Sequence, residues 1–158
     1  MRPNLLVNRY AKAFLELAIQ NNVVDKALDD LHLVKSTIEG NKELDTLIHQ
    51  PFVSKERKTN IMNRLFTDRV EKITLNLINL LIEKNRDTAI TDMYDEYRML
   101  YLEYKKIAVV TITSAIEIDE KTTDRIVNIL KYKIVDKDTI EIKNVIDKNI
   151  IGGFIVKY

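Results

Sequence analysis

The sequence predicts a mainly α-helical protein, with a six-helix bundle in residues 1–105 and a small α/β domain in residues 106–158. Apolar residues recur with the helical period through the first two thirds of the chain. After residue 106 the pattern changes to short runs rich in Val, Ile and Thr. The chain is 46% hydrophobic and has only three glycines and two prolines, which is typical of a folded, helix-rich protein.

The first predicted helix, residues 5–18, carries two adjoining apolar stripes. One stripe is Leu6, Tyr10, Ala13 and Leu17, and the other is Val7, Ala11, Phe14 and Ala18. Together they form an apolar arc wider than one contact with a core requires. Two interpretations follow: a central helix contacted on two sides by its own chain, or a helix with one side left for a partner.

Stop and cap signals divide the next stretch into three helices. Asn21 ends the first helix, and Gly40 ends the second. Pro51 ends a short third helix, because proline has no amide donor and clashes with the preceding turn. Ser54 is a suitable N-cap for a fourth helix that continues to Phe66.

The fifth helix, residues 73–82, is the most apolar segment of the predicted bundle. Its aliphatic side chains cover more than half of the helix circumference at ~100° per residue, so most of it must be buried. Asn76 and Asn79 lie on the remaining face. A sixth helix follows Asp87 and carries four tyrosines. Such a stripe usually packs with its hydroxyls toward water and is rarely a cofactor site.

The pattern in the last third of the chain predicts strands around one helix. Residues 107–115 form a Val- and Ile-rich strand, and residues 139–143 alternate apolar and charged side chains like a half-exposed strand. Asp119 is a suitable cap for an intervening helix. One face of that helix carries Ile126, Ile129 and Leu130.

A third strand, residues 150–156, is predicted with Gly152 and Gly153 inside it. A phosphate-binding loop is excluded there, because no Gly-Lys-Ser/Thr follows and a glycine pair within a strand more often marks a bulge or a close backbone approach. A domain of about 50 residues is only marginally stable by itself. We therefore expect it to rest on another surface.

The charges and polar residues exclude several function classes. Lys and Arg number 25 against 24 Asp and Glu, so a nucleic-acid binder, which needs a strongly basic patch, is not expected. There is no cysteine, and His32 and His49 lack the spacing of a metal-binding pair. The basic run 55–58 contains its own acid and is interpreted as a solvated helix face. No catalytic, cofactor or metal site is predicted, which leaves protein binding.

The chain also lacks targeting signals. Its first nine residues are too short and too polar for a secretory signal, and its apolar stretches fall well below the ~20 residues of a transmembrane helix. Neither export nor membrane insertion is expected.

Three stretches resemble the delta subunits of bacterial F-type ATP synthases, whose mitochondrial counterpart is the oligomycin-sensitivity-conferring protein. They are Arg9-Tyr10-Ala11-Lys12-Ala13-Phe14, Leu80-Leu81-Ile82-Glu83-Lys84-Asn85-Arg86, and residues 140–157 with their Gly-Gly pair. The resemblance covers the whole chain. It implies the same division into a six-helix bundle and a small α/β domain.

The resemblance implies a non-catalytic stator subunit of a proton-translocating ATP synthase. Such a subunit links the catalytic head to the peripheral stalk, so that the head resists the torque of the rotor. It is peripheral, at the cytoplasmic face of a bacterial cell membrane. The alternative from composition is an all-helical RNA-binding transcription regulator of the antitermination type, which the neutral charge disfavours.

The resemblance also implies two partner sites. The family binds the N-terminal helix of an alpha subunit between its first and fifth helices. Position by position, this site corresponds to Leu6, Tyr10, Ala13, Leu17, Asn76 and Leu80. Ala13 would permit close approach of a helix. Any of these positions could instead contact only its own chain.

The small C-terminal domain is expected to meet the b subunits of the peripheral stalk. Its characteristic motif is Asp147, Gly152 and Gly153. Family members continue for roughly another twenty residues, so the stalk site is expected to be truncated here and its binding to b weak.

Overall fold

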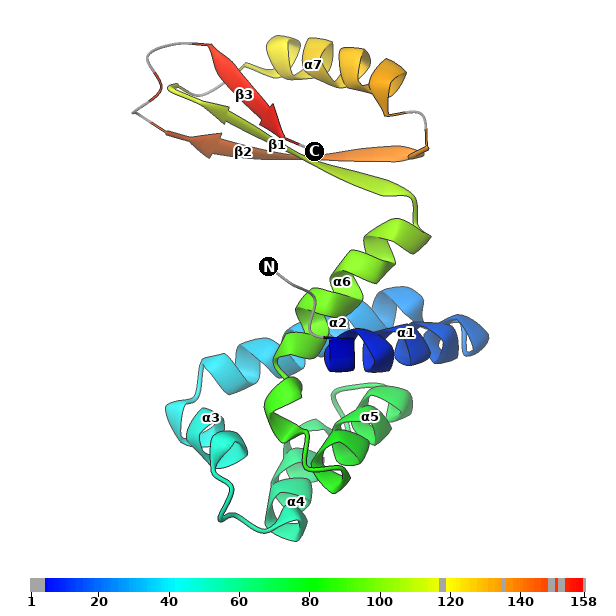
Figure 1. The fold of residues 1–158 in the computed structure, drawn as a ribbon, viewed down its shortest axis with the longest axis vertical. Helices are drawn as coiled ribbons and strands as arrows, with labels where there is room; N and C mark the ends of the chain where they lie inside the picture. Colours follow the sequence, from blue (N-terminus) through cyan, green and yellow to red (C-terminus); the bar gives the residue numbers. More distant parts are fainter. Residues whose placement is uncertain (1–4, 117–118, 135, 148–149, 151–152, 158) are drawn as a thin grey trace. The chain divides into compact units, whose positions relative to one another are not determined.

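The structure is a computed structural model that describes residues 5–116, 119–134, 136–147, 150 and 153–157. It divides into two compact units, residues 1–101 and 102–158. The described residues form a mainly α-helical protein with a small α/β part at the C-terminal end, which confirms the predicted fold class (Figure 1).

Six α-helices and one short 3₁₀ turn build the first unit. They are α1 (Leu5–Gln20), α2 (Val24–Glu39), α3 (Lys42–His49), α4 (Lys55–Phe66), α5 (Lys72–Glu83), the 3₁₀ turn Asp87–Ala89 and α6 (Asp92–Tyr104), whose last residues enter the second unit. All six were predicted from the helical period and the stop signals.

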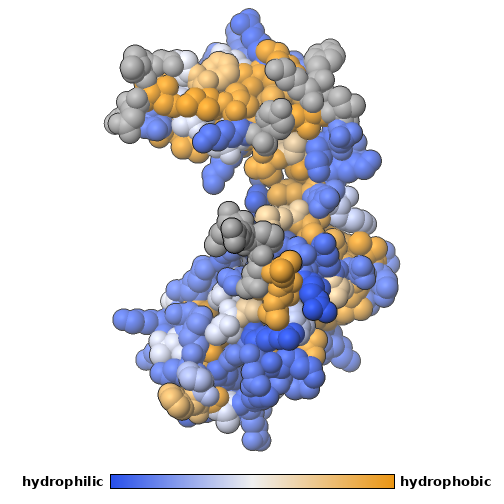
Figure 2. Space-filling model, viewed as in Figure 1, coloured by the Kyte–Doolittle hydropathy of each residue, from blue (hydrophilic) through white to orange (hydrophobic). Residues whose placement is uncertain are grey.

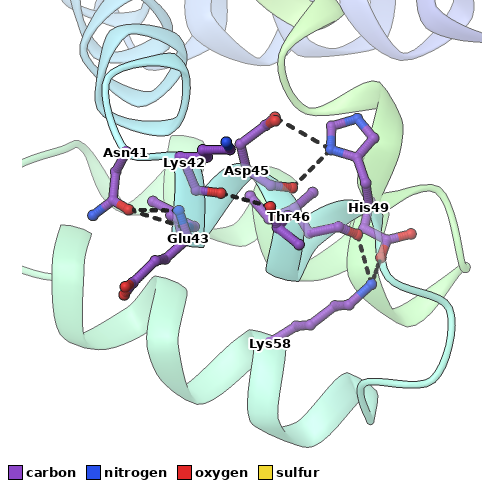
Figure 3. A network of polar contacts seen from close by, with 10 residues as sticks. Asn41, Lys42, Glu43, Asp45, Thr46, His49 and Lys58 are labelled. Carbon is purple, nitrogen blue, oxygen red and sulfur yellow. Dashed lines mark hydrogen bonds and ion pairs between the residues drawn. The ribbon is translucent and has the colours of Figure 1, made fainter.

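Short polar residues set several helix boundaries. Asn41 Oδ1 accepts hydrogen bonds from the amides of Glu43 and Leu44 at 3.0 and 3.1 Å and so opens α3 (Figure 3). Ser54 Oγ accepts from the amide of Arg57 at 3.3 Å, as its predicted capping role requires. Asn85 follows the end of α5 with a φ of 55°, a left-handed conformation that asparagine tolerates better than most residues.

The core of the helical unit takes only one of the two stripes of α1. Val7, Ala11, Phe14 and Ala18 are buried there. On α5, Leu77, Ile78, Leu81 and Ile82 are buried, as the wide apolar arc predicted. Asn79 does not share the exposed face of Asn76, because its Nδ2 donates to Asn63 Oδ1 on α4 at 3.0 Å.

The tyrosines of α6 were expected to point their hydroxyls toward water, and for Tyr97 this is wrong. Tyr97 is fully buried, with its ring centroid 5.3 Å from that of Phe14. Its hydroxyl donates to the carbonyl of Val24 at 3.1 Å. The carbonyl of Val24, at the start of α2, takes the place of water as the partner of the hydroxyl. Tyr101 donates similarly to Asp25 Oδ1 at 2.7 Å.

The basic run 55–58 was interpreted as solvated, and Lys58 contradicts this. Its side chain is only 4% exposed. Lys58 Nζ donates to the carbonyl of Ile48 at the end of α3, at 2.6 Å (Figure 3), and forms an ion pair with Asp87. Lys55 stays exposed and donates to the carbonyl of Glu83 at 2.7 Å. Lys58 therefore joins α3, α4 and the turn after α5.

Buried and half-buried charges on α2 bind two further helices. The Asp30 carboxylate accepts from the amide of Glu71 at 2.6 Å and from Thr74 Oγ1 at 3.0 Å, at the start of α5. Lys35 Nζ lies 2.5 Å from Asp95 Oδ2 on α6, and this hydrogen bond raises the pKa of Lys35 above its ordinary value.

The second unit is a three-stranded sheet with one helix over it. Its elements are β1 (Ile107–Ser114), α7 (Glu120–Lys133), β2 (Thr139–Ile146) and β3 (Phe154–Lys157). The strand order is β2-β1-β3. β2 is parallel to β1 and is reached through α7, while β3 is antiparallel to β1. Figure 1 shows α7 over one face of this sheet.

The core of the second unit is small. It consists of Val110, Ile112, Ile126 and Leu130. Ile129 was predicted on the same helix face, but it is 59% exposed, because the small sheet covers only a narrow stripe of α7. Asp119 caps α7 as predicted, and hydrogen bonds from the hydroxyl and the amide of Thr122 lower its pKa below the ordinary value.

Candidate partner-binding site

Two adjoining hollows follow the outer face of α1. The first, about 180 Å³, lies between α1 and α5. It is lined by Tyr10, Ala13, Phe14, Leu17, Ile73, Asn76, Leu77 and Leu80. The second, about 280 Å³, lies toward the start of α1 and is lined by Leu6, Arg9, Tyr10, Ala13 and Arg86. Tyr10 and Ala13 line both hollows, so the two form one surface, called the α1–α5 groove below.

The structure brings the six residues of the predicted alpha-subunit site together in this groove. Leu6 lines the second hollow, Leu17, Asn76 and Leu80 line the first, and Tyr10 and Ala13 line both. Each of the six is half-buried or exposed, so none is absorbed into the core. Whether they bind a partner stays a prediction.

The packing of α1 explains why this stripe faces outward. Val7, Ala11, Phe14 and Ala18 occupy the core, and successive residues turn by ~100°. The adjoining stripe therefore lies beside the core and meets α5. On α5 the groove residues Ile73, Asn76, Leu77 and Leu80 follow the i, i+3, i+4, i+7 spacing of one helix face.

Large aliphatic side chains remain exposed on both walls of the groove. Leu17 on α1 is 41% exposed and Leu80 on α5 is 39% exposed. Ala13, a small exposed residue one turn before Leu17 on α1, lines the same hollow. A helix laid in the groove could bury both leucines and approach the backbone of α1 closely at Ala13.

Two arginines line the groove, and the sequence did not predict either of them there. Arg86 Nη1 donates to the hydroxyl of Tyr10, and its Cζ lies 5.3 Å from the centroid of the Tyr10 ring. Arg9 is exposed on α1. Arg86 follows left-handed Asn85, just after the end of α5. Its contact with Tyr10 joins residues 76 positions apart, beyond the reach of periodicity.

Two residues of the predicted stalk-binding motif, Asp147 and Gly153, lie next to the ends of sheet strands. The Asp147 amide donates to the carbonyl of Ser114 at 2.8 Å, directly after β2. Gly152 lies outside the described residues. Gly153 precedes β3 with a φ of 77°, so it supplies a left-handed turn.

The predicted strand at residues 150–156 is thus wrong at Ile150 and Gly153, which lie outside β3, while residues 151–152 are not among the described residues. A close backbone approach at Gly153 is also wrong, because among the described residues no atom beyond its chain neighbours lies within 4 Å of the position its Cβ would take.

The sheet exposes apolar side chains near these ends. Thr113 on β1 lies opposite Val145 on β2 and Ile155 on β3, so the three side chains form one row. Successive residues of a strand point to opposite faces of the sheet. Ile112, next to Thr113 on β1, is buried in the core against α7. The row therefore lies on the face of the sheet that α7 leaves open. Figure 2 shows an apolar band over this unit, and Ile155 is 48% exposed.

The described residues lack two other features: a metal-binding cluster and a helix that could span a membrane. No group of three or more His, Asp or Glu side chains lies close enough to hold a metal ion in the part of the chain that the structure describes. Across the same residues, none of the helices has the length and apolar character needed to cross a bilayer.

The first unit thus carries an open groove between two helices, a form that suits an amphipathic helix. The chain belongs to the ATP synthase delta (OSCP) subunit family, whose model matches residues 6–158.

Relatives and a solved structure agree with this family. The ATP synthase subunit delta of Flavobacterium psychrophilum is 36% identical over 94% of this chain and 82% of its own length. The sodium ion specific subunit delta of Ilyobacter tartaricus is also 36% identical, over 94% of this chain and 84% of its own length. A chain of the Toxoplasma gondii mitochondrial ATP synthase hexamer has the same fold, with a TM-score of 0.70 and 20% identity over 95% of this chain and 84% of its own.

Family membership settles the function class. The protein is a non-catalytic subunit of the F-type ATP synthase and a component of its stator and peripheral stalk. The enzyme is the membrane-associated complex as a whole. The alternative of an RNA-binding transcription regulator is not supported.

Proposed function

We propose that the α1–α5 groove binds the N-terminal helix of an alpha subunit of the catalytic head, and that the C-terminal unit binds the b subunits of the peripheral stalk. On this proposal the chain works at the cytoplasmic face of a bacterial membrane. A stator link needs two separate attachment sites, because torque on the head must pass through the protein to the stalk. The two compact units provide one surface each.

The observation that carries the proposal is the exposed apolar lining of the groove. Leu17 and Leu80 expose aliphatic surface on facing helices, and burying apolar surface contributes about 25 cal/mol per Å². A groove between two helices suits an amphipathic helix with apolar residues at i, i+3, i+4 and i+7. Ala13 leaves the space in which such a helix would lie.

The groove can be tested by filling it. We expect Ala13→Trp to raise the Kd of an alpha N-terminal peptide at least tenfold, since an indole at this position would occupy the space between Tyr10 and Leu17. Tenfold corresponds to about 1.4 kcal/mol. Isothermal titration calorimetry measures the affinity, and circular dichroism checks that the helical content is unchanged.

The matched control is Ile19→Trp. Ile19 is also exposed on α1, but it lines neither hollow. The control should bind the peptide like the unmodified protein. An unchanged affinity of Ala13→Trp for the alpha peptide would contradict the proposed alpha site.

The open face of the sheet can be tested in the same way. We expect Ile155→Glu to weaken capture of this chain by immobilised b subunits about tenfold, because a charge would enter an apolar contact. Ile129→Glu is the control: it is the same substitution at an exposed isoleucine, but it lies on α7. Equal losses in the two variants would contradict a stalk contact through this row. Thermal unfolding verifies that both variants are folded.

A further inference from the structure

We infer that the helix in the α1–α5 groove carries a carboxylate side chain that Arg9 and Arg86 hold, about two helical turns from its main apolar anchor. This inference rests on the proposed function and specifies the partner that the groove selects. It follows from the unequal chemistry of the two ends of the groove.

Arg86 is already oriented for such a contact. Its guanidinium donates one hydrogen bond to the hydroxyl of Tyr10 and lies near the Tyr10 ring. A guanidinium has five N–H donors, so others remain for a ligand. Because the Tyr10 contact fixes the side chain beforehand, binding an anion here costs less conformational entropy than at a freely rotating arginine.

The charges around this end favour an anion. Arg9 lines the same hollow and is exposed. Within the described part of the chain, neither Arg9 nor Arg86 forms an ion pair. The first turn of α1 also lacks an acidic residue, so the positive end of its helix dipole is not compensated by its own side chains. The hollow of about 280 Å³ has room for a carboxylate and several waters.

The described residues that line the other end of the groove include no charged side chain. Leu17, Leu77 and Leu80 line it together with Phe14, Ile73 and Asn76. A carboxylate there would lose water without gaining a partner. The groove therefore discriminates along its length: a polar end accepts an anion, and an apolar end accepts aliphatic side chains.

The spacing of the two ends defines a pattern in the partner. Tyr10, beside Arg86, and Leu17 are seven residues apart on α1, which is about 10 Å along a helix axis. A helix lying along α1 would therefore carry its acidic residue about seven positions from the apolar residue that contacts Leu17 and Leu80. This pattern separates a true partner from an amphipathic helix with a basic or uncharged polar face.

The test is a double-mutant cycle with the N-terminal segment of the alpha subunit of the same organism, made as a synthetic peptide. Each acidic residue of the peptide is replaced in turn by its amide. We expect one replacement to raise the Kd for the unmodified protein about tenfold, as does Arg86→Gln with the unmodified peptide. The two changes together should cost little more than either alone, and the coupling should shrink at higher salt.

Two further variants make the result specific. Tyr10→Phe keeps the ring and the charge of Arg86 but removes the hydroxyl, and we expect a smaller rise in Kd. Arg64→Gln removes an exposed arginine from α4, away from the groove, and should leave the Kd unchanged. Additive effects of the peptide and Arg86 changes would overturn the inference, as would a segment without an acidic residue at the stated spacing. If Ala13→Trp still weakens binding in that case, the alpha site itself stands.

Discussion

Lys58→Met is expected to lower the free energy of unfolding by about 3 to 5 kcal/mol, because it removes one partner of a buried charge pair. Methionine keeps most of the apolar stem, so loss of packing contributes little. What is lost is the ammonium group that binds the carbonyl of Ile48 and the carboxylate of Asp87. The carbonyl at the end of α3 and the carboxylate after α5, which is only 16% exposed, would then lack that partner.

Urea unfolding of the full chain, followed by the helical signal in circular dichroism, measures this change. Lys55→Met is the matched control, from the same basic run and the same helix. Its ammonium group is exposed and bonds only one carbonyl, so we expect a loss below about 1 kcal/mol. Adding Asp87→Asn to Lys58→Met should recover part of the loss, since no unpaired charge remains. A Lys58→Met variant as stable as the Lys55→Met control would contradict the assigned role.

Lys58 also marks the limit of what the sequence predicts about the fold. The helices and strands were found because their signals are local: apolar period, caps such as Ser54, and stops such as Gly40. Whether a charged residue is buried depends on what the rest of the chain places over it. The run 55–58 gives no sign that its last lysine would meet the end of α3 and Asp87.

The same distinction applies to the tyrosines and to α7. Periodicity placed Tyr97 on the apolar stripe of α6, but only the position of α2 decides that its hydroxyl finds the carbonyl of Val24 and not water. Ile129 fits the apolar pattern of α7, yet the sheet is too narrow to cover it. Local sequence defines a face, and the tertiary neighbours decide how much of that face is buried.

The candidate site divides in the same way. The wide apolar arc of α1 indicated a surplus stripe, but periodicity could not distinguish a second contact within the chain from an open groove. In the structure, Phe14 and its stripe fill the core while Leu17 remains exposed, which supports the open groove. Arg86 was missed as a groove residue because its link to Tyr10 depends on how the turn after α5 returns to α1.

Asp30→Ala is expected to destabilise the protein by about 3 kcal/mol and to loosen one wall of the groove. Asp30 is buried, and its carboxylate accepts from the Glu71 amide and the Thr74 hydroxyl where α5 begins. It therefore acts as an N-terminal cap supplied by another helix, and its negative charge faces the positive end of the helix dipole. Alanine would leave the buried Thr74 hydroxyl and the half-buried Glu71 amide without this partner, and hydrogen bonds to a charged group contribute about 1.5 to 3 kcal/mol each.

Urea unfolding of three variants separates this role from a general charge effect. Asp29→Ala removes the neighbouring exposed carboxylate and should change stability by less than about 0.5 kcal/mol. Thr74→Val removes the Thr74 hydroxyl donor and should cost about 1 kcal/mol of stability. The double variant Asp30→Ala/Thr74→Val should lose less stability than the sum of the two single losses, since both changes break the same hydrogen bond. The groove residues Ile73 and Asn76 lie in the first turns of α5. A frayed start of α5 would therefore also weaken binding of the alpha peptide to the groove. Strictly additive losses, or a stable Asp30→Ala variant, would show that α5 is held by its apolar face alone.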